Sequence, residues 1–299
     1  CTDANGNTAS YSYNSMGQLI TLTDAAGNIT RYMWDMAGNQ TGTQAPDGGL
    51  TTYTLNKSGN VTAVTDALGY RTDFEYDGNR NIVKGTDPEG NIVTYTYDGN
   101  GNKLDSTDAA GNKTVYTYDA GNRLVKTVTA DGAVTTNTYN TDGLLTKITD
   151  AFGRQTYYEY DTSLKKVIKE TDASGSVTEY SYDADGSLTQ ITYPDGLSKT
   201  YSYDKTGRVI KTIEENGLEV LYGYDKAGRL TKKTFNNEST YTYEYDNNGN
   251  LISETDPEGN RVSYTYDVCN RQDSCTDAAG NKTTYTYDSN GNLLAVKDA

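Results

Sequence analysis

Histidine is absent from the 299 residues, and cysteine, proline and long apolar runs are scarce. Without histidine, neither a Ser/His/Asp nor a Cys/His catalytic arrangement is available, and the three cysteines do not have the spacing of zinc ligands. No apolar run reaches the roughly 18 residues that a membrane-spanning helix needs. The sequence therefore predicts no catalytic, cofactor-binding or metal-binding residues of these kinds, and no membrane span.

Aliphatic residues and positive charge are also in short supply. The hydrophobic fraction is 34%, and tyrosine alone supplies 28 of those residues. Such a composition favours a sheet one layer thick, with an aromatic and semi-polar face, over a fold with a thick aliphatic core. The formal net charge is −15. Because a polyanionic surface repels nucleic acid and anionic lipid, neither is expected as a partner.

What the sequence has in abundance is a repeat of 21 residues. The unit Tyr-x-Tyr-Asp, as in Tyr95–Asp98, recurs 14 times with one inserted residue, and its two tyrosine columns hold 24 of the 28 tyrosines. A fixed period of this length indicates a repeat architecture, so residues 1–299 are interpreted as one continuous array. Cys1–Asp3 has the same phase as Cys275–Asp277, and the sequence stops within a turn at Asp298–Ala299. We therefore expect a segment of a longer array, cut within a repeat at both ends.

Each repeat contains two strands and two turns. Residues two apart in a strand point to the same face, so the two tyrosines of a unit should lie side by side. Turns such as Asp24–Gly27 and Asp87–Gly90 have the signature of a type I turn, followed by glycine in a left-handed bulge. The second position of this turn holds all four prolines, Pro46, Pro88, Pro194 and Pro257.

These signals predict an all-β fold of tandem 21-residue β-hairpins, which form a single-layer antiparallel sheet. Two turns per repeat leave room for about 28 strands of about five or six residues, and a sheet of that width must twist into a spiral. The insertion falls at Thr162–Lys165, which also lacks the turn glycine. It represents either tolerated drift or a bend. Cys269 and Cys275, six residues apart across a predicted hairpin, are either a disulfide or incidental thiols.

Acidic residues are numerous, so a catalytic carboxylate pair and a calcium-binding loop both have to be considered. Asp105 and Asp108 could form an acid–base pair, since glycosidases need two carboxylates a few ångströms apart. Asp98–Asn102 partly resembles a calcium loop, but Lys103 stands where an EF-hand has glycine. These aspartates recur in repeat after repeat, as turn caps should and as a catalytic pair should not. We therefore interpret these aspartates as structural, with calcium binding at an acidic turn as the alternative.

The pattern Tyr-x-Tyr-Asp-x-x-Gly-Asn/Arg-Leu, seen in Tyr116–Leu124 and Tyr222–Leu230, resembles the YD repeats of the Rhs family. The resemblance covers essentially the whole chain and extends to wall-associated polymorphic toxins, shells of insecticidal toxin complexes and animal teneurins. It implies a spiralling β-shell, which in the bacterial toxins encloses a C-terminal toxin domain. The core segment that ends such shells, in many cases with an aspartate-based self-cleavage site, and the toxin itself are not visible in this sequence. The resemblance therefore implies a wall and no toxic activity.

Two functions follow from the sequence. The first is a non-catalytic wall segment of a secreted or surface-exposed bacterial toxin, whose partner is the enclosed C-terminal toxin polypeptide of the same parent chain. The alternative is an adhesive or carbohydrate-binding stalk at the cell surface, with a glycan or protein as its partner. Irregular exposed aromatic residues would serve the alternative better than the regular tyrosine columns, and the candidates are Trp34, Tyr70 and Tyr193.

Overall fold

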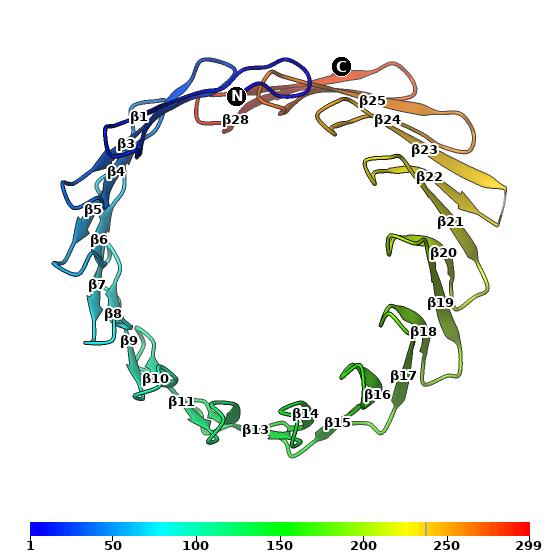
Figure 1. Cartoon of the computed structure of the whole chain (residues 1–299), viewed down its shortest axis with the longest axis horizontal. Coiled ribbons are helices and arrows are strands. Elements are labelled where there is room, and N and C mark those ends of the chain that lie inside the picture. Colours follow the sequence, from blue (N-terminus) through cyan, green and yellow to red (C-terminus); the bar gives the residue numbers. More distant parts are fainter. Residues whose placement is uncertain (237) are drawn as a thin grey trace. The chain divides into compact units, whose positions relative to one another are not determined.

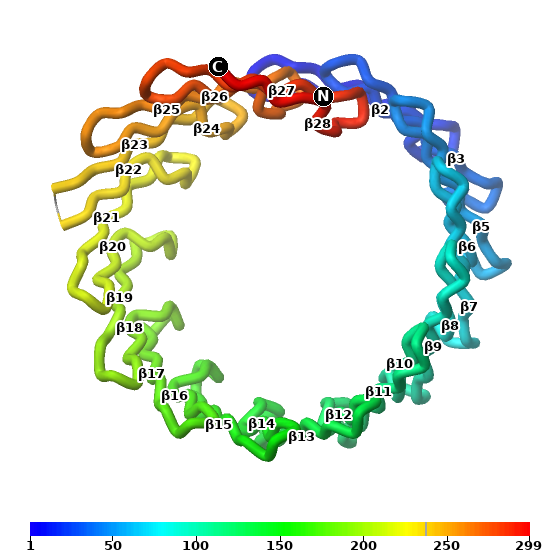
Figure 2. The backbone as a smooth tube through the Cα atoms, turned by 180° about the vertical axis from the view of Figure 1, so that it is seen from behind, coloured from blue at the N-terminus to red at the C-terminus, as the bar shows by residue number. Residues whose placement is uncertain are grey.

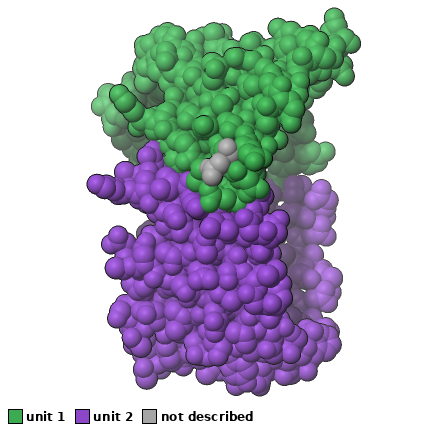
Figure 3. All heavy atoms as spheres, turned by 90° about the vertical axis from the view of Figure 1, so that its right-hand side faces the viewer, with its two compact units in different colours: residues 1–71, 219–299 green, residues 72–218 purple. Residues whose placement is uncertain are grey.

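The structure, a computed structural model, describes residues 1–236 and 238–299, which form 28 β-strands and no helix. The predicted all-β class is therefore confirmed. The chain divides into two compact units, which Figure 3 colours separately: unit 1 is residues 1–71 with 219–299, and unit 2 is residues 72–218. The part of the chain that the structure describes contains no helix long and apolar enough to cross a membrane.

Unit 1 consists of two runs of antiparallel hairpins, one from each end of the chain (Figure 1). Within each run, every strand pairs with the next strand along the chain. The first run contains β1 (Ser10–Tyr13), β2 (Leu19–Thr23), β3 (Ile29–Trp34), β4 (Gln40–Gln44), β5 (Leu50–Leu55) and β6 (Val61–Thr65). The second contains β21 (Glu219–Tyr224), β22 (Leu230–Phe235), β23 (Ser239–Tyr245), β24 (Leu251–Thr255), β25 (Arg261–Tyr266), β26 (Gln272–Thr276), β27 (Lys282–Tyr287) and β28 (Leu293–Lys297).

Unit 2 is a single run of the same hairpins, again with antiparallel pairing between consecutive strands. Its strands are β7 (Arg71–Tyr76), β8 (Ile82–Thr86), β9 (Ile92–Tyr97), β10 (Lys103–Thr107), β11 (Lys113–Tyr118), β12 (Leu124–Val128), β13 (Val134–Tyr139), β14 (Leu145–Thr149), β15 (Gln155–Tyr160), β16 (Val167–Thr171), β17 (Val177–Tyr182), β18 (Leu188–Thr192), β19 (Ser198–Tyr203) and β20 (Val209–Ile213).

The turns have the predicted hydrogen-bond pattern. In the turn after β2, the Gly27 amide donates to the Asp24 carbonyl at 3.1 Å, and the Asp24 amide donates to the Asn28 carbonyl at 3.0 Å. Gly27 has a φ of 87°, a left-handed conformation that glycine adopts without strain. The Asp24 carboxylate accepts the backbone amides of Ala26 and Asn28 at 2.9 and 2.8 Å. One aspartate thus fixes the whole turn.

The one-residue insertion enlarges a turn and leaves the strands in register. In the turn after β15, the Lys165 amide donates to the Asp161 carbonyl at 3.1 Å, and Lys165 takes the left-handed conformation with a φ of 55°. The pairing of β15 with β16 keeps the register of the other hairpins. The insertion is therefore absorbed locally. The sequence also lacks the second turn glycine at residues 236–238, but residue 237 lies outside the described residues.

Each unit is one layer of sheet, as the scarcity of aliphatic residues indicated. Few of the described side chains are fully buried, and the apolar ones are Ala63 and Val220, with exposed fractions of 1% and 2%. Most tyrosines of the two columns are half-buried on one face of the sheet, which we call the tyrosine face. Stability must therefore come from contacts between neighbouring repeats, as in other repeat proteins.

Candidate functional site

Tyrosines at the third position of the repeat reach back to the preceding repeat. The Tyr203 hydroxyl donates a 2.7 Å hydrogen bond to the backbone carbonyl of Leu188, fifteen residues earlier. Tyr182 pairs with Leu188 and Ser181 with Gln190, so a bulge interrupts the ladder at this carbonyl. The hydroxyl thus ties its own repeat to the bulge of the one before. The same bond, at 2.7–2.9 Å, is made by Tyr139, Tyr160, Tyr182, Tyr245, Tyr266 and Tyr287.

Arginines in the turns add a second tie between repeats. Arg229 donates to the Asp225 carboxylate of its own turn at 2.7 Å, and to the Asp246 carbonyl of the next repeat at 2.8 Å. Its guanidinium carbon lies 4.9 Å from the centre of the Tyr245 ring, a cation–π distance. Arg271 makes the equivalent contacts with Asp267, Asp288 and Tyr287. The tyrosine columns are therefore occupied in holding the sheet together.

The most distinctive feature of unit 1 is a seam between its two runs of hairpins. Both Figures 1 and 2 show the first strands of the chain beside the last ones. Three turns of the first run each meet one turn of the second run. We call this contact the seam, and its turn pairs are residues 3–6 with 246–249, 24–27 with 267–270, and 45–48 with 288–291.

The first pair of turns is joined by reciprocal hydrogen bonds. The Asn5 amide donates to the Asn248 side-chain oxygen at 3.1 Å, and the Asn5 side chain donates to the Asp246 carboxylate at 3.0 Å. In return, the Asn248 side chain donates to Asp3 at 2.8 Å. Desolvation raises the pKa of Asp3, but hydrogen bonds from Asn7, Asn248 and Asn5 outweigh it and lower the pKa to about 2. The seam therefore contains an ionised aspartate held by amides.

The other two pairs repeat this geometry with different side chains. The Asp47 amide donates to the Asn290 side-chain oxygen at 3.2 Å. Between the two outer pairs, the Cys269 thiol lies 3.5 Å from the Asp24 carboxylate and also meets the Ala26 amide. Burial raises the pKa of Cys269, and the neighbouring Asp24 adds to the rise. The thiol is thus kept protonated, as a donor to Asp24.

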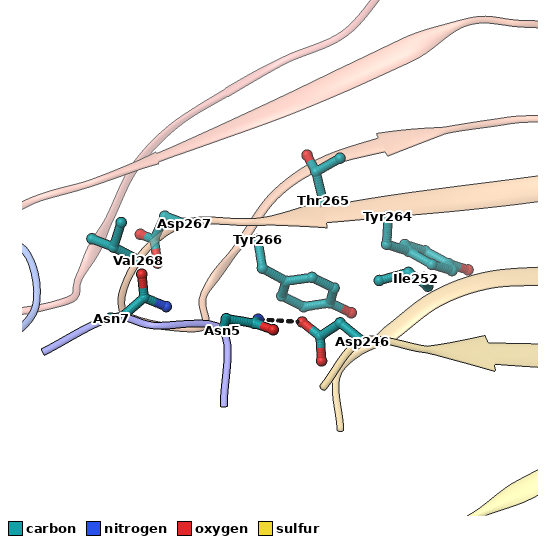
Figure 4. A pocket seen from close by; sticks show the side chains of 9 residues that line it. All are labelled: Asn5, Asn7, Asp246, Ile252, Tyr264, Thr265, Tyr266, Asp267 and Val268. Atoms are coloured by element: carbon teal, nitrogen blue, oxygen red, sulfur yellow. Dashed lines mark hydrogen bonds between the residues drawn. The ribbon is translucent and has the colours of Figure 1, made fainter. Parts of the chain in front are cut away.

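A pocket of about 300 Å³ opens beside the first turn pair (Figure 4). Figure 4 shows the Tyr266 ring beside the hydrogen bond from Asn5 to Asp246. Asp246 also accepts from Asn250, and the Tyr266 hydroxyl donates to the Leu251 carbonyl at 2.8 Å. The polar groups that line the pocket are therefore already engaged in the seam and in the sheet.

The seam can be tested with a single isosteric substitution. Asn248→Asp replaces the amide donor to Asp3 with a carboxylate, and the new charge also lies near Asp246. We expect the first turn to loosen by about 1 kcal/mol, because one hydrogen bond is lost and like charges meet. Faster hydrogen exchange of the amides of residues 3–9 would report the change.

Asn100→Asp is the matched control. Asn100 occupies the same position of its turn and donates to Asn122 at 3.0 Å, as Asn248 donates to Asn270 at 2.8 Å, but it has no seam partner. The control should leave exchange in residues 3–9 unchanged. Equal exchange in both variants would show that the seam does not hold this turn.

Comparison with known proteins agrees with the repeat geometry. The family model described as RHS Repeat matches the sequence in ten places that cover most of the chain. The chain belongs to the RHS repeat family. The matches are to a repeat and not to a family of enzymes, and no curated protein matches the chain in sequence. The matched residues are 2–29, 17–52, 56–90, 97–134, 164–200, 183–219, 203–240, 224–261, 245–272 and 274–299.

One solved toxin-complex structure has the same fold as these RHS repeats. The crystal structure of TcdB2-TccC3-TEV is similar over 97% of this chain and 21% of its own, with a TM-score of 0.57 and 17% identity. The chain thus spans about a fifth of the length of that structure. The crystal structure of TcdB2-TccC3 and the Tc holotoxin pore of Photorhabdus luminescens are each 17% identical with a TM-score of 0.43, over 97% of this chain and 22% and 21% of theirs.

The aspartates considered above as an acid–base pair or a calcium loop each have a different structural role in their RHS repeat. Asp105 lies on β10 and pairs with Lys113 at 3.0 Å. Asp108 caps the following turn, accepting the amides of Ala110 and Asn112 at 2.9 and 2.8 Å. Asp98 caps its turn in the same way. Among the described residues, no group of three or more acidic or cysteine side chains is placed to hold a metal ion.

The aromatic residues proposed for sugar stacking lie in different surroundings. The Trp34 indole donates to the Leu19 carbonyl at 2.8 Å, fifteen residues earlier, so it replaces a column tyrosine in the ties of the RHS repeats. Tyr70 is 56% exposed at the end of a turn. The pKa of Tyr193 is raised by desolvation and then by its hydrogen bond to Glu215, so this hydroxyl is engaged. None of the three residues lines the pocket beside the first turn pair.

All three cysteines are free thiols in the structure. Cys269 contacts Asp24 at the seam, whereas Cys275 lies on β26 opposite Tyr264.

The ties and the seam were not predicted from the sequence. The fifteen-residue spacing between most third-position tyrosines and an aliphatic residue was a visible signal for the ties, but only the bulge explains why that carbonyl accepts a side-chain donor.

Proposed function

We propose that this chain is a non-catalytic wall segment of a hollow β-shell, and that the shell encloses the C-terminal toxin polypeptide of the same parent chain. The observation that carries the proposal is the run of RHS repeats along the chain, in a fold similar to a toxin-complex structure. On this proposal the 14 repeats of residues 1–299 form one continuous array, in a bacterial protein that acts outside the cell or at its surface.

The chemistry of the described residues suits a barrier. Turn aspartates, column tyrosines and turn arginines are engaged in the fold itself, and the pocket side chains at the seam are engaged with one another. The tyrosine face is broad and moderately polar, because ring edges and threonines share it. Such a face can lie against an unfolded polypeptide without the strong hold of an aliphatic groove. No residue needs to act on the enclosed chain.

The test is protection of the toxin polypeptide in the full-length parent protein. Deleting Tyr95 through Thr136 removes two whole repeats and rejoins strands of matching phase. We expect the shell fold to survive and the toxin to become sensitive to protease, because enclosure depends on the length of the array. The measurement is limited proteolysis with detection of the toxin fragment.

Phe152→Ala is the control, since Phe152 is 84% exposed in a turn and should not affect protection. Equal protection in the parent and the deletion variant would contradict enclosure. Loss of function from one substitution on the tyrosine face, with the shell intact, would instead favour a specific binding role. Glycan binding on an array that is lost in the Trp34→Ala variant would support the carbohydrate-binding alternative.

A further inference from the structure

Tyr157, on β15 of unit 2, departs from the repeat. It stands one place before the tyrosine columns, so its side chain points to the sheet face opposite the tyrosine face. Other repeats most often have threonine at this place, as in Thr94, Thr136 and Thr200. The Tyr157 side chain is 45% exposed, and its hydroxyl donates to the Gln155 side chain on the same strand. One aromatic ring is therefore open to solvent on this face.

Two lysines accompany Tyr157 on the same face. Lys147 on β14 lies directly opposite Tyr157, and Lys126 has the same place in the preceding repeat, on β12. Because neighbouring strands are about 4.8 Å apart, the two lysines are separated by about 10 Å across the sheet. Neither has an acidic partner among the described residues, unlike Lys84 of the same column, which pairs with Glu75 at 2.7 Å. Two positive charges are thus available to a ligand.

Threonine hydroxyls lie beside both lysines. Thr136 on β13 is opposite Lys126, and Thr138 on the same strand is opposite Lys147. A threonine hydroxyl can both donate and accept a hydrogen bond. We call Lys126, Thr136, Thr138, Lys147 and Tyr157 the Tyr157 patch. It combines an aromatic ring, two ammonium groups and hydroxyls on one face of four consecutive strands.

The charge of this face differs from that of the whole chain. The net charge is −15, but most of the acidic residues lie in the turns at the strand ends. The described residues on this face of β11 to β15 include one acidic side chain, Glu159, which pairs with Lys169 at 3.1 Å. At physiological salt, exposed charges more than about 8 Å apart are largely screened. The Tyr157 patch is therefore locally positive.

We propose that the Tyr157 patch binds an acidic polysaccharide, a chain of sugars with carboxylates at intervals. The Tyr157 ring stacks on the apolar C–H face of one sugar, and the two lysines pair with carboxylates on either side. The threonine hydroxyls bond to sugar hydroxyls. The proposal goes beyond the wall function and does not rest on it, because the patch lies on the face opposite the one assigned to the enclosed polypeptide.

The wide spacing of the positive charges selects this partner over nucleic acid. A nucleic acid strand carries a phosphate about every 3.4 Å, so two lysines about 10 Å apart would leave most of its charge unpaired. A polysaccharide with a carboxylate on every second sugar carries fewer charges. Between them it presents hydroxyls and apolar C–H faces, which match the threonines and the ring of the patch.

The test is calorimetric titration of the 299-residue chain with a hyaluronan decasaccharide, which carries a carboxylate on every second sugar. Tyr157→Thr introduces the residue that other repeats have at this place, so the strand should keep its fold. We expect this variant to raise Kd about tenfold through loss of stacking, whereas Tyr157→Phe, which keeps the ring, should bind like the natural chain. The double variant Lys126→Gln, Lys147→Gln should raise Kd about fivefold.

Two control variants and one control ligand make the result specific. Lys84→Gln changes a lysine of the same column whose charge is already matched, and Tyr70→Ala removes a tyrosine that is exposed in a turn. Both should bind like the natural chain. A carboxyl-reduced decasaccharide should bind more weakly than the acidic one. Absence of binding by the natural chain, an unchanged Kd in Tyr157→Thr, or equal affinity for the two decasaccharides would overturn the proposal.

A single-stranded oligonucleotide with the same number of charges tests the competing class of partner. Tighter binding of the oligonucleotide than of the decasaccharide, lost in the double lysine variant, would assign the patch to nucleic acid and overturn the proposal. No toxin polypeptide is present in this assay. Its failure therefore leaves the enclosure test intact, and failure of enclosure leaves the binding of the polysaccharide intact.

Discussion

The Tyr203→Ala variant should be less stable by about 2–3 kcal/mol in β18 and β19, the strands joined by the Tyr203 hydroxyl. Truncating a fully buried aromatic side chain costs about 3–5 kcal/mol, and this ring is only half-buried. The substitution also removes the 2.7 Å bond to the Leu188 carbonyl. Because repeat proteins are stabilised mainly by contacts between neighbours, the loss should be regional. Hydrogen exchange should accelerate in β17 to β20 and stay unchanged in β9 and β10.

Two further variants separate the ring from its hydroxyl. Tyr203→Phe keeps the ring and should cost about 1 kcal/mol, the usual contribution of one hydrogen bond. Ser202→Ala, the neighbouring residue on the opposite face, should have little effect because its side chain is exposed. If Tyr203→Ala and Ser202→Ala give the same exchange rates, the tyrosine columns do not hold the repeats in register.

The local structure was predictable because each element is specified by residues within one repeat. Aspartate at the first position of a turn and glycine at the fourth fix the turn through their own hydrogen bonds, as in Asp24–Gly27. Proline occurs at the second turn position, where no ladder bond is lost. The scarcity of aliphatic residues likewise indicated a single layer. These signals need no knowledge of distant parts of the chain.

The ties between repeats were not predictable in the same way. The sequence places two tyrosines on one face, which suggested stacked rings. Instead, seven third-position tyrosines donate to a carbonyl beside a bulge, and arginines such as Arg229 lie over the rings. Whether a strand bulges depends on backbone geometry that the tyrosine pattern does not encode. Trp34 illustrates the difference, since an irregular aromatic residue has a structural role.

The seam could not be predicted from the sequence for another reason. Its partners, such as Asn5 and Asn248, are separated by 243 residues, and each lies in a turn like many others. The residues themselves are ordinary turn residues, and asparagine recurs at the same position in Asn100 and Asn290. Only the three-dimensional path of the chain decides which turns meet. Once one pair of turns meets, the 21-residue period brings the next turns of both runs together as well.

The turn aspartates make the protein sensitive to acid. Seventeen aspartates at the first position of a turn have a pKa below the ordinary value of 3.8. In Asp108, for example, hydrogen bonds from the Asn112 side chain and backbone lower the pKa. Because the pKa is lower in the folded state than in the unfolded chain, these carboxylates stabilise the fold above pH 3.8. That stabilisation is lost as the pH falls through the folded-state values.

We therefore expect cooperative unfolding as the pH falls from about 4 to about 2, with uptake of several protons per molecule.

The matched variant replaces four turn aspartates with asparagine: Asp87→Asn, Asp108→Asn, Asp256→Asn and Asp277→Asn. Asparagine also caps a turn of this kind in the natural sequence, since the Asn56 side chain accepts the amides of Ser58 and Asn60 at 2.9 and 3.0 Å. Asparagine does not titrate, so proton uptake should fall by roughly a quarter and the midpoint should move to lower pH. Circular dichroism across the pH range, with potentiometric titration, measures both quantities. An unchanged midpoint and proton uptake in the variant would show that acid acts on other groups.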